Sequence, residues 1–402
     1  MRILVADKLP AASIDHLQRC NFEVVFEPQL KDHPLEEALA AHNPQILVVR
    51  STRVTASHVN AAPGLALVIR AGAGVNTIDL PSCSAHGIYV ANCPGKNAIA
   101  VAELTLGLMM AIDRSIPDNV RDLRAQTWNK KKYAKANGLH GQSLGLLGLG
   151  QIGRQVARRA QAMGMQVVAW SPSLNEEKCK EFGIQYAPTP LDVASNCQIL
   201  SVHLALKEET RGLVDADLLD RLPNGATFIN TSRAEVVDEE ALLETLNAGR
   251  LRAGLDVFSG EPQTSPSQWE HPLASHPAVY GTHHIGASTQ QAQEAIGSAV
   301  CDTATEFRDH GRVTNCVNLA RKPVSNTRLI VRHLDRVGVL ASVLSTLRSD
   351  GISVGTMENL IFEGNEAACA RIQLRGRPSE AAISLMQKQP DILSVSLLDT
   401  SS

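Results

Sequence analysis

Short apolar runs recur along the first hundred residues and alternate with amphipathic stretches. The intervening segments SIDHLQRC and PLEEALAAH place their apolar residues at helical spacing. The strand-like runs are RILVA (2–6), EVVFE (23–27), QILVVR (45–50) and ALVIR (66–70). Strands that are apolar at consecutive positions are buried on both faces, as in a parallel sheet covered by helices. The pattern therefore predicts an α/β domain with a doubly wound sheet.

A second alternation of the same kind begins at 144. Its strand-like runs are LGLLG (144–148), QVVAW (166–170), CQILSVH (197–203), ATFIN (226–230) and RAGLDVF (252–258). The segment 98–112 is apolar on nearly all sides, which predicts a buried helix. These features predict a second doubly wound parallel sheet, of the type that binds dinucleotides.

The last part of the chain has a different rhythm. Over 327–402 the order of apolar and amphipathic segments predicts βαββαβ, a small ferredoxin-like α+β module. The polar segment 316–326, which contains Pro, Asn and Ser, is predicted to be a linker.

Composition narrows the class of protein. The net charge of −3 shows no basic excess of the kind that nucleic-acid binding requires, and aromatic residues make up only 3%. The apolar run 104–112 is too short to cross a bilayer, and the first residues lack a secretory signal pattern. Eight cysteines stand without any Cys-x-x-Cys pair, so we expect a cytoplasmic protein without a metal site.

A glycine motif opens the second alternation. Gly148, Gly150 and Gly153 follow an apolar strand and begin an amphipathic helix, with Gln151 and Ile152 between them. In this context the glycines let the main chain approach a pyrophosphate, and the helix N-terminus supplies N–H donors. The motif predicts a bound dinucleotide.

The second strand–helix alternation leaves the choice between NAD and NADP open. An NAD site usually has an acidic residue about 20 residues after the glycines, where it holds the ribose hydroxyls. Ser171 stands in that place, and no arginine follows that would favour a 2′-phosphate. We therefore expect NAD without excluding NADP.

Three loops that follow strands of the second sheet carry candidate chemistry. Arg233 comes just after ATFIN, Asp256 and Glu261 come at and after the next strand, and His284 follows the last. Carboxyl ends of parallel strands share one edge of the sheet, so these side chains can converge. An arginine can clamp a carboxylate, and a histidine paired with a glutamate can take and return a proton.

These segments resemble the D-isomer-specific 2-hydroxyacid dehydrogenases. The resemblance covers about 1–315 and rests on several motifs in the family's order. They are RAGAGVNTID (70–79), NCPGKNAIAVAE (92–103), GLGQIG, NTSRAEVVDEEAL, GLDVFSGEP and HIGAST. It implies an NAD(P)-dependent dehydrogenase with a substrate-binding domain over 1–97 and 284–315 and a cofactor domain over 98–283.

The resemblance also implies roles for individual residues. His284, Arg233 and Glu261 would be catalytic. The cofactor would lie against Gly148, Gly150, Gln151, Ile152, Gly153, Ser171, His203, Thr231 and Asp256, with Asp256 at the nicotinamide carboxamide. A substrate carrying a carboxylate and a phosphate would lie against Arg233, Arg50, Ser51 and the turn Gly72, Ala73 and Gly74. For His203, a buried core histidine is an equally good interpretation.

The two adjacent histidines need separate roles. In an extended segment neighbouring side chains point to opposite faces, so His283 and His284 cannot both reach one substrate carbon. His284 stands immediately before Ile-Gly, as in the family, and His283 stands where relatives have proline. We expect His284 to be the acid/base and His283 to line the site.

The C-terminal module resembles an ACT domain through VRHLDRVGVLASVL. This resemblance implies regulation by an amino acid such as L-serine, with His333 and Asp335 beside it, or a module that only dimerises. It also favours a homo-oligomer, a dimer or a tetramer. Two other functions stay open: a reductase of glyoxylate, hydroxypyruvate or another 2-keto acid, and a dinucleotide-sensing corepressor or scaffold.

Overall fold

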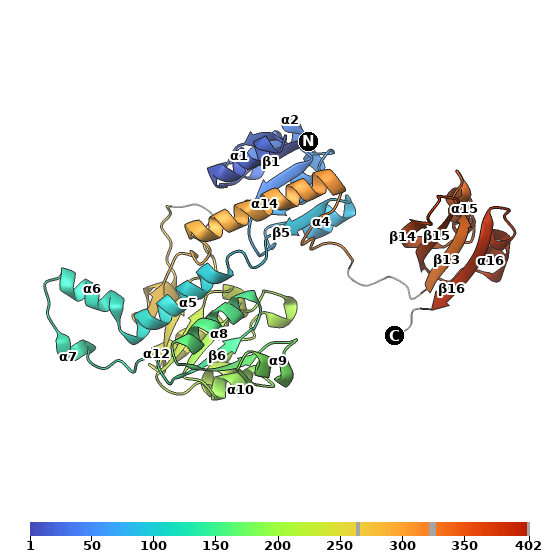
Figure 1. The fold of residues 1–402 in the computed structure, drawn as a ribbon. Helices are drawn as coiled ribbons and strands as arrows, with labels where there is room; N and C mark the ends of the chain where they lie inside the picture. Colours follow the sequence, from blue (N-terminus) through green and yellow to red (C-terminus); the bar gives the residue numbers. More distant parts are fainter. Residues whose placement is uncertain (263–265, 321–326, 400–402) are drawn as a thin grey trace. The chain divides into compact units, whose positions relative to one another are not determined.

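The computed structural model describes residues 1–262, 266–320 and 327–399. They form two compact units, Met1–Asn318 and Leu319–Ser402. The first unit contains two parallel sheets and the second contains one antiparallel sheet (Figure 1). This arrangement confirms the predicted fold class of two doubly wound α/β sheets followed by a small α+β domain.

The first sheet has the strand order β2-β1-β3-β4-β5, with all neighbours parallel. Its strands are β1 (Arg2–Val5), β2 (Glu23–Phe26), β3 (Ile46–Val49), β4 (Leu67–Arg70) and β5 (Tyr89–Asn92). Helices α1 (Ala11–Arg19) and α14 (Gln290–His310) cover one face. Helices α2 (Asp32–His42), α3 (Ala56–Ala61) and α4 (Leu80–Ala85) cover the other. The sequence analysis did not predict β5.

The second sheet has the order β12-β11-β10-β9-β6-β7-β8, again all parallel. Its strands are β6 (Ser143–Leu147), β7 (Gln166–Trp170), β8 (Gln185–Tyr186), β9 (Ile199–Val202), β10 (Ala226–Asn230), β11 (Leu251–Leu255) and β12 (Val279–Gly281). The order of strands reverses between β6 and β9, because β7 and β8 lie on one side of β6 and β9 to β12 on the other, and ligands bind at such a point in open α/β sheets.

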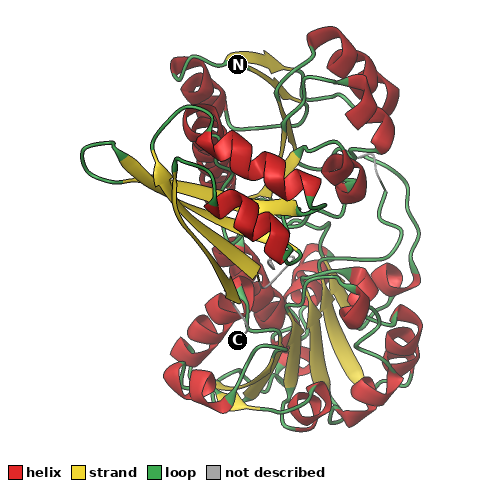
Figure 2. Cartoon of the chain, turned by 90° about the vertical axis from the view of Figure 1, so that its right-hand side faces the viewer, coloured by secondary structure: helices red, strands yellow, loops and turns green. Residues whose placement is uncertain are grey.

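Helices pack on both faces of this second sheet (Figure 2). The apolar helix α5 (Ala98–Asp113) and α8 (Gln151–Ala162) bury one face. The other face is covered by α10 (Pro190–Ser195), α11 (Ala216–Arg221), α12 (Glu239–Asn247) and α13 (Pro272–Ser275). Shorter elements complete the unit: α6 (Ile116–Arg124), α7 (Lys130–Tyr133), α9 (Glu176–Glu181), η1 (Glu208–Thr210) and η2 (Ala234–Val236).

The first unit extends slightly into the segment predicted as a linker. Cys316 forms a β-bridge with Ala91, and the Asn318 side chain accepts a hydrogen bond from the Val90 N–H at 2.9 Å. The boundary between the units therefore falls after Asn318 rather than at 316, because these residues pair with β5. The rest of the predicted linker, 321–326, lies outside the described residues.

The second unit has the predicted βαββαβ order. Its sheet, β14-β15-β13-β16, is antiparallel. The elements are β13 (Thr327–Leu334), α15 (Val339–Ser349), β14 (Ser353–Ile361), β15 (Ala367–Arg375), α16 (Glu380–Gln387) and β16 (Ile392–Asp399). One face packs under the two helices around Val331, Val343 and Met386. No helix in the described parts of the chain is long and apolar enough to span a membrane.

Candidate active site

His284 and Glu261 form a close pair at the carboxyl end of the second sheet. The Nδ1 atom of His284 lies 2.7 Å from Oε2 of Glu261. Both side chains are partly exposed, His284 by 47% and Glu261 by 33%, so the pair can meet a ligand from solvent. With Nδ1 bound to a carboxylate, Nε2 of His284 is the nitrogen left to exchange a proton with a substrate.

Glu261 is held in its ionised form. Burial raises the pKa of its carboxyl, but the hydrogen bonds from His284 and from the Phe258 N–H lower it by more. The charge of Arg233 acts in the same direction, so the pKa of Glu261 lies below its usual value. An ionised Glu261 favours the imidazolium of His284, as proton transfer to that histidine requires.

The loop that carries His284 was expected to be extended, but the structure shows that it is not. His284 lies in a bend with φ of 52°, a left-handed conformation that is uncommon for a residue with a side chain. The conclusion about the two histidines still follows from contacts. His284 reaches Glu261, and the exposed His283 does not take part in that pair.

Asp256 holds this bend from below. Its Oδ1 accepts hydrogen bonds from the Thr282 hydroxyl (2.6 Å) and the Ile285 N–H (2.8 Å), and its Oδ2 accepts one from the Gly286 N–H (2.9 Å). The side chain is 1% exposed. The contact of Asp256 with a nicotinamide carboxamide stays a prediction; in the described structure its oxygens accept from the Thr282 hydroxyl and from the main chain around His284.

Arg233 reaches toward the first sheet. It follows β10, where the buried Asn230 accepts from the Ser232 N–H (2.9 Å) and donates to the Arg233 carbonyl (3.0 Å), which fixes the loop. A Cβ atom on Gly74 would lie 2.6 Å from Nη2 of Arg233. Glycine at 74 thus leaves room for a guanidinium at the turn after β4.

Arg70 is a cleft residue that the sequence analysis missed. It ends β4, and a Cβ atom on Gly72 would overlap its guanidinium. Burial, together with the charges of Arg233 and Arg50, lowers the pKa of Arg70 to about 10. Its Nε is buried without a hydrogen bond in the described structure. An arginine at the carboxyl end of a buried strand, in VIRAGAG, is the signal that could have revealed it.

The turn 72–74 has the predicted features of an anion site. The Ala73 carbonyl accepts from the Asn92 side chain at 2.6 Å, which anchors the turn to β5. Within the residues that the structure describes, the N–H groups of Ala73 and Gly74 make no hydrogen bond. Two free N–H donors beside two guanidiniums suit a carboxylate or a phosphate.

The predicted phosphate loop at Arg50 is organised by Asp7, which the sequence analysis did not single out. Oδ2 of Asp7 accepts the N–H groups of Arg50 (2.6 Å), Ser51 (3.0 Å) and Thr52 (2.9 Å). Arg50 is partly buried and donates to Gln293 at 2.6 Å, and burial lowers its pKa. The Ser51 hydroxyl donates to Asp7, so it is already engaged.

The glycine motif fits a dinucleotide by steric criteria. Gly148 has φ of 102°, and a Cβ there would lie 2.6 Å from the His203 carbonyl oxygen. A Cβ on Gly153 would overlap the Gly148 carbonyl, so this glycine permits close helix–strand packing. A Cβ on Gly150 would enter open space. That open side is where a pyrophosphate could approach the main chain and the start of α8.

The remaining predicted cofactor residues differ in availability. Ser171 is half-buried after β7, whereas Gln151 is exposed at the start of α8 beside Gly95. The buried Thr231 hydroxyl shares a hydrogen bond of 2.9 Å with Thr105. His203 lies under the glycine loop with Nε2 bonded to the Ser201 hydroxyl, Nδ1 buried without a partner, and its pKa lowered by burial to about 3.

In the second unit the two predicted effector residues differ in their exposure to solvent. His333 is 1% exposed, and its nitrogens bond to the Leu334 carbonyl (2.7 Å) and the Asn359 amide oxygen (3.2 Å). Both ring nitrogens of His333 are thus used inside the fold, and its contact with an effector stays a prediction. Asp335 is exposed.

Comparison with known proteins shows the family of the chain. Residues 106–286 match the model of the "D-isomer specific 2-hydroxyacid dehydrogenase, NAD binding domain". The chain is 33% identical over 369 residues to a D-3-phosphoglycerate dehydrogenase of Methanocaldococcus jannaschii, covering 91% of this chain and 68% of that protein. The chain belongs to the D-isomer specific 2-hydroxyacid dehydrogenase family.

Other relatives point the same way. A D-3-phosphoglycerate dehydrogenase of Bacillus subtilis is 34% identical, and the chain spans 64% of its length while 86% of this chain is covered. The structure titled as a cofactor (NAD+) bound 3-phosphoglycerate dehydrogenase in Entamoeba histolytica superposes with a TM-score of 0.66 at 26% identity, covering 79% of this chain and 99% of that one.

Proposed function

We propose that the chain is a D-3-phosphoglycerate dehydrogenase. It would oxidise 3-phosphoglycerate to 3-phosphohydroxypyruvate with NAD, the step that opens the phosphorylated route to L-serine. A cytoplasmic location is part of the proposal, since its eight unpaired cysteines suit a reducing compartment.

The observation that carries the proposal is a group of three arginines, one of which, Arg233, interacts electrostatically with Glu261 of the His284–Glu261 pair. Arg50, Arg70 and Arg233 interact electrostatically at this place, and two free N–H groups of the 72–74 turn lie beside them. Like charges this close are stabilised by a ligand with more than one negative charge. A substrate with a carboxylate at one end and a phosphate at the other supplies them.

The chemistry divides between the chain and the dinucleotide. Nε2 of His284 takes the proton of the C2 hydroxyl, and Glu261 stabilises the imidazolium that forms. Arg233 holds the carboxylate so that C2 stays beside His284. When bound against Gly148, Gly150 and Gly153, the dinucleotide accepts the C2 hydrogen as hydride, and the C2–O single bond becomes a carbonyl.

The test is turnover in purified variants. His284→Ala and Arg233→Ala are expected to lower kcat/KM for 3-phosphoglycerate roughly 100- to 10,000-fold while dinucleotide binding stays intact. Kinetics with 3-phosphoglycerate, glycerate and 2-hydroxy acids without phosphate would locate the substrate. A preference for unphosphorylated acids would indicate a glyoxylate or hydroxypyruvate reductase, and no turnover at all would favour a dinucleotide-sensing scaffold.

We also propose that the chain forms a homo-oligomer through the segment 115–138. Helix α6 exposes Ile116, Val120 and Leu123 on one face, and Trp128 after it is 81% exposed. In Figure 1 this segment stands away from β6 and its neighbours. An apolar stripe that no part of the described chain covers is typical of a protein interface.

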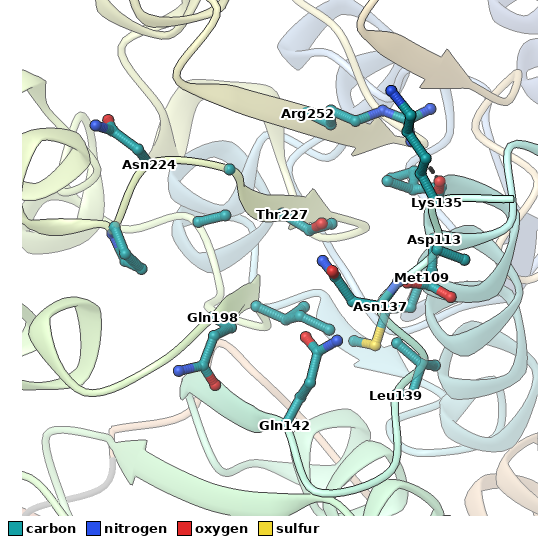
Figure 3. Close-up of a pocket in the computed structure, with 16 residues that line it drawn as sticks. Met109, Asp113, Lys135, Asn137, Leu139, Gln142, Gln198, Asn224, Thr227 and Arg252 are labelled. Atoms are coloured by element: carbon teal, nitrogen blue, oxygen red, sulfur yellow. Dashed lines mark hydrogen bonds between the residues drawn. The ribbon is translucent and has the colours of Figure 1, made fainter. Parts of the chain in front are cut away.

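A cavity beside this segment is the place where a second copy would pack. It has a volume of about 560 Å³ and lies at the amino ends of the second sheet, away from the glycine loop. Figure 3 shows Gln142, Gln198 and Arg252 around it, with Asp113 and Met109 from α5. Trp128→Ala with Leu123→Glu is expected to shift the protein to monomers in sedimentation velocity. An unchanged oligomer would place the interface elsewhere.

The second unit would be regulatory. The βαββαβ topology and the exposed Asp335 before α15 support an amino-acid effector, with L-serine as the first to test. L-serine is expected to lower turnover of the full-length protein, and Asp335→Ala is expected to weaken that inhibition. Absence of inhibition in the native protein would leave dimerisation as the role of this unit.

A further inference from the structure

A second hydrogen-bonded cluster involves the main chain just before Glu261. The Glu239 carboxylate, in the first turn of α12, accepts the Ser259 N–H at 3.0 Å and also the Ser259 hydroxyl. Nε2 of His271 lies 3.3 Å from Glu239 Oε2 and 3.2 Å from the Ser259 hydroxyl. His271 and Glu239 are only 11% and 18% exposed. These three residues form a polar cluster in which the His271 and Glu239 side chains are mostly buried and Ser259 is exposed.

An aromatic group encloses the cluster. The His271 ring stacks on Trp269, with centroids 5.1 Å apart, and Phe258 meets both rings edge-on. The Trp269 indole N–H donates to the Gly260 carbonyl at 3.0 Å. Residues 258, 259 and 260 are thus each held by a separate contact, and the next residue in the chain is Glu261.

The geometry does not fit a nucleophile with a histidine base. In such a triad the acid and the hydroxyl bond to different ring nitrogens. In this cluster both Glu239 and Ser259 approach Nε2, whereas Nδ1 of His271 is buried without a hydrogen bond in the described structure. The Ser259 hydroxyl donates to Glu239 rather than to the imidazole. Positioning is the chemistry that this arrangement supports.

The cluster also joins two loops of the cleft. Glu239 begins the helix that follows the Arg233 loop, and Ser259 belongs to the loop that carries Glu261. The contact between Glu239 and Ser259 therefore fixes the position of the Glu261 carboxylate relative to the Arg233 guanidinium. Side chains that orient a reacting group in this way commonly control its contribution to the rate.

We propose that Glu239, Ser259 and His271 are positioning residues that lock the 258–260 main chain and so hold Glu261 against His284. The inference rests on the proposed function, in which the Glu261–His284 pair exchanges the substrate proton. None of the three residues needs to touch the substrate or the dinucleotide.

The first experiment compares two adjacent glutamates in the native full-length protein. Glu239→Ala removes both acceptors of Ser259. Glu240→Ala removes the same charge from the same helix turn, but among the described residues its exposed side chain makes no hydrogen bond or ion pair with the cluster. We expect Glu239→Ala to lower kcat roughly 10- to 100-fold with little change in KM for NAD. Glu240→Ala should behave like the native protein.

The pH profile separates positioning from loss of structure. With Glu261 held less firmly, the imidazolium of His284 is less favoured, so the acid limb of kcat/KM for oxidation should move to lower pH. Glu261→Gln should move it in the same direction and further. Glu239→Gln keeps an acceptor for the Ser259 N–H and should restore most of the rate. Adding Glu239→Ala to Glu261→Gln should cost little more, because both act on one pair.

A chemical readout makes the test independent of the substrate. Diethyl pyrocarbonate acylates neutral imidazoles, and mass spectrometry of the peptide that contains both histidines resolves His284 from the exposed His283. Because Nδ1 of His284 is bonded to Glu261 at 2.7 Å, Glu239→Ala and Glu261→Gln should each speed acylation of His284 and leave that of His283 unchanged. If Glu239→Ala alters neither the acylation rate nor the acid limb more than Glu240→Ala does, the positioning role is wrong. Failure of the proposed substrate alone would leave the acylation result intact.

Discussion

Asp7 and Asp256 perform similar tasks at the ends of strands in the two parallel sheets, but they use their oxygens differently. All three N–H donors at Asp7 converge on Oδ2, and Oδ1 receives only the Ser51 hydroxyl. At Asp256, both oxygens accept main-chain N–H groups, from Ile285 and from Gly286. The two buried aspartates therefore differ in one oxygen: Oδ1 of Asp7 accepts from a hydroxyl, whereas both oxygens of Asp256 accept from main-chain N–H groups.

The difference predicts opposite tolerance of the same isosteric change. An asparagine has one acceptor oxygen and one donor nitrogen. At position 7 the oxygen can replace Oδ2 while the amide nitrogen donates to Ser51, which can accept. At position 256 either orientation sets the amide nitrogen against an N–H donor. We therefore expect Asp256→Asn to be tolerated less well than Asp7→Asn.

The largest effect is expected for Asp256→Asn. One main-chain N–H of the His284 bend loses its acceptor, which should lower the free energy of unfolding by about 1–3 kcal/mol. Because the bend holds His284 at a positive φ, kcat should fall roughly 100-fold. Urea unfolding and steady-state kinetics measure the two quantities. Thr282→Val, which removes only the hydroxyl donor, is the milder control, and equal rates for Asp256→Asn and the native protein would contradict the comparison.

At Asp7 the choice of substitution should decide the outcome. Asp7→Ala leaves the N–H groups of the Arg50 loop without their acceptor and should raise KM for 3-phosphoglycerate about tenfold. Asp7→Asn should change KM by less than about threefold, since the acceptor remains. Initial-rate kinetics on both variants compare them directly. Equal defects in Asp7→Asn and Asp7→Ala would show that the negative charge, not the acceptor geometry, matters there.

His203 sharpens the comparison because it is an ionisable group whose Nδ1 atom is buried without a hydrogen bond in the described structure. Burial lowers its pKa to about 3 from 6.5, so only the unfolded chain takes up a proton between these values. Stability is therefore unaffected above pH 6.5, falls as the pH decreases through this window, and stops falling near pH 3. His203→Gln should remove roughly 2 kcal/mol of that loss at pH 5. Chemical unfolding at pH 7 and pH 5 tests this, with the exposed His16→Gln as the control.

The smallest effect is expected at Ser171, which stands at the position where an NAD site usually has an acidic residue. Ser171→Asp would supply a carboxylate for the ribose hydroxyls and repel a 2′-phosphate. The ratio of kcat/KM for NAD to that for NADP should rise about tenfold, which corresponds to about 1.4 kcal/mol. A ratio that stays constant would mean that other parts of the site discriminate the two dinucleotides.

Local sequence patterns predicted much of the architecture. Apolar strands and amphipathic helices gave the two parallel sheets and the βαββαβ unit, because side-chain periodicity depends only on local backbone geometry. Short strands with mixed composition, such as β5, carry too weak a local signal. The histidine loop was treated as extended because no pattern reveals a left-handed φ at a residue like His284.

The sequence by itself determined the strand–helix order, the glycine motif at 148–153 and the three residues Arg233, Glu261 and His284. Only the tertiary structure decided that Arg70 joins Arg233, that Asp256 holds the His284 bend, and that Glu239 meets His271. Each of these contacts joins residues from different loops of the chain. Their direction depends on how whole sheets pack, and a local run of residues does not encode that.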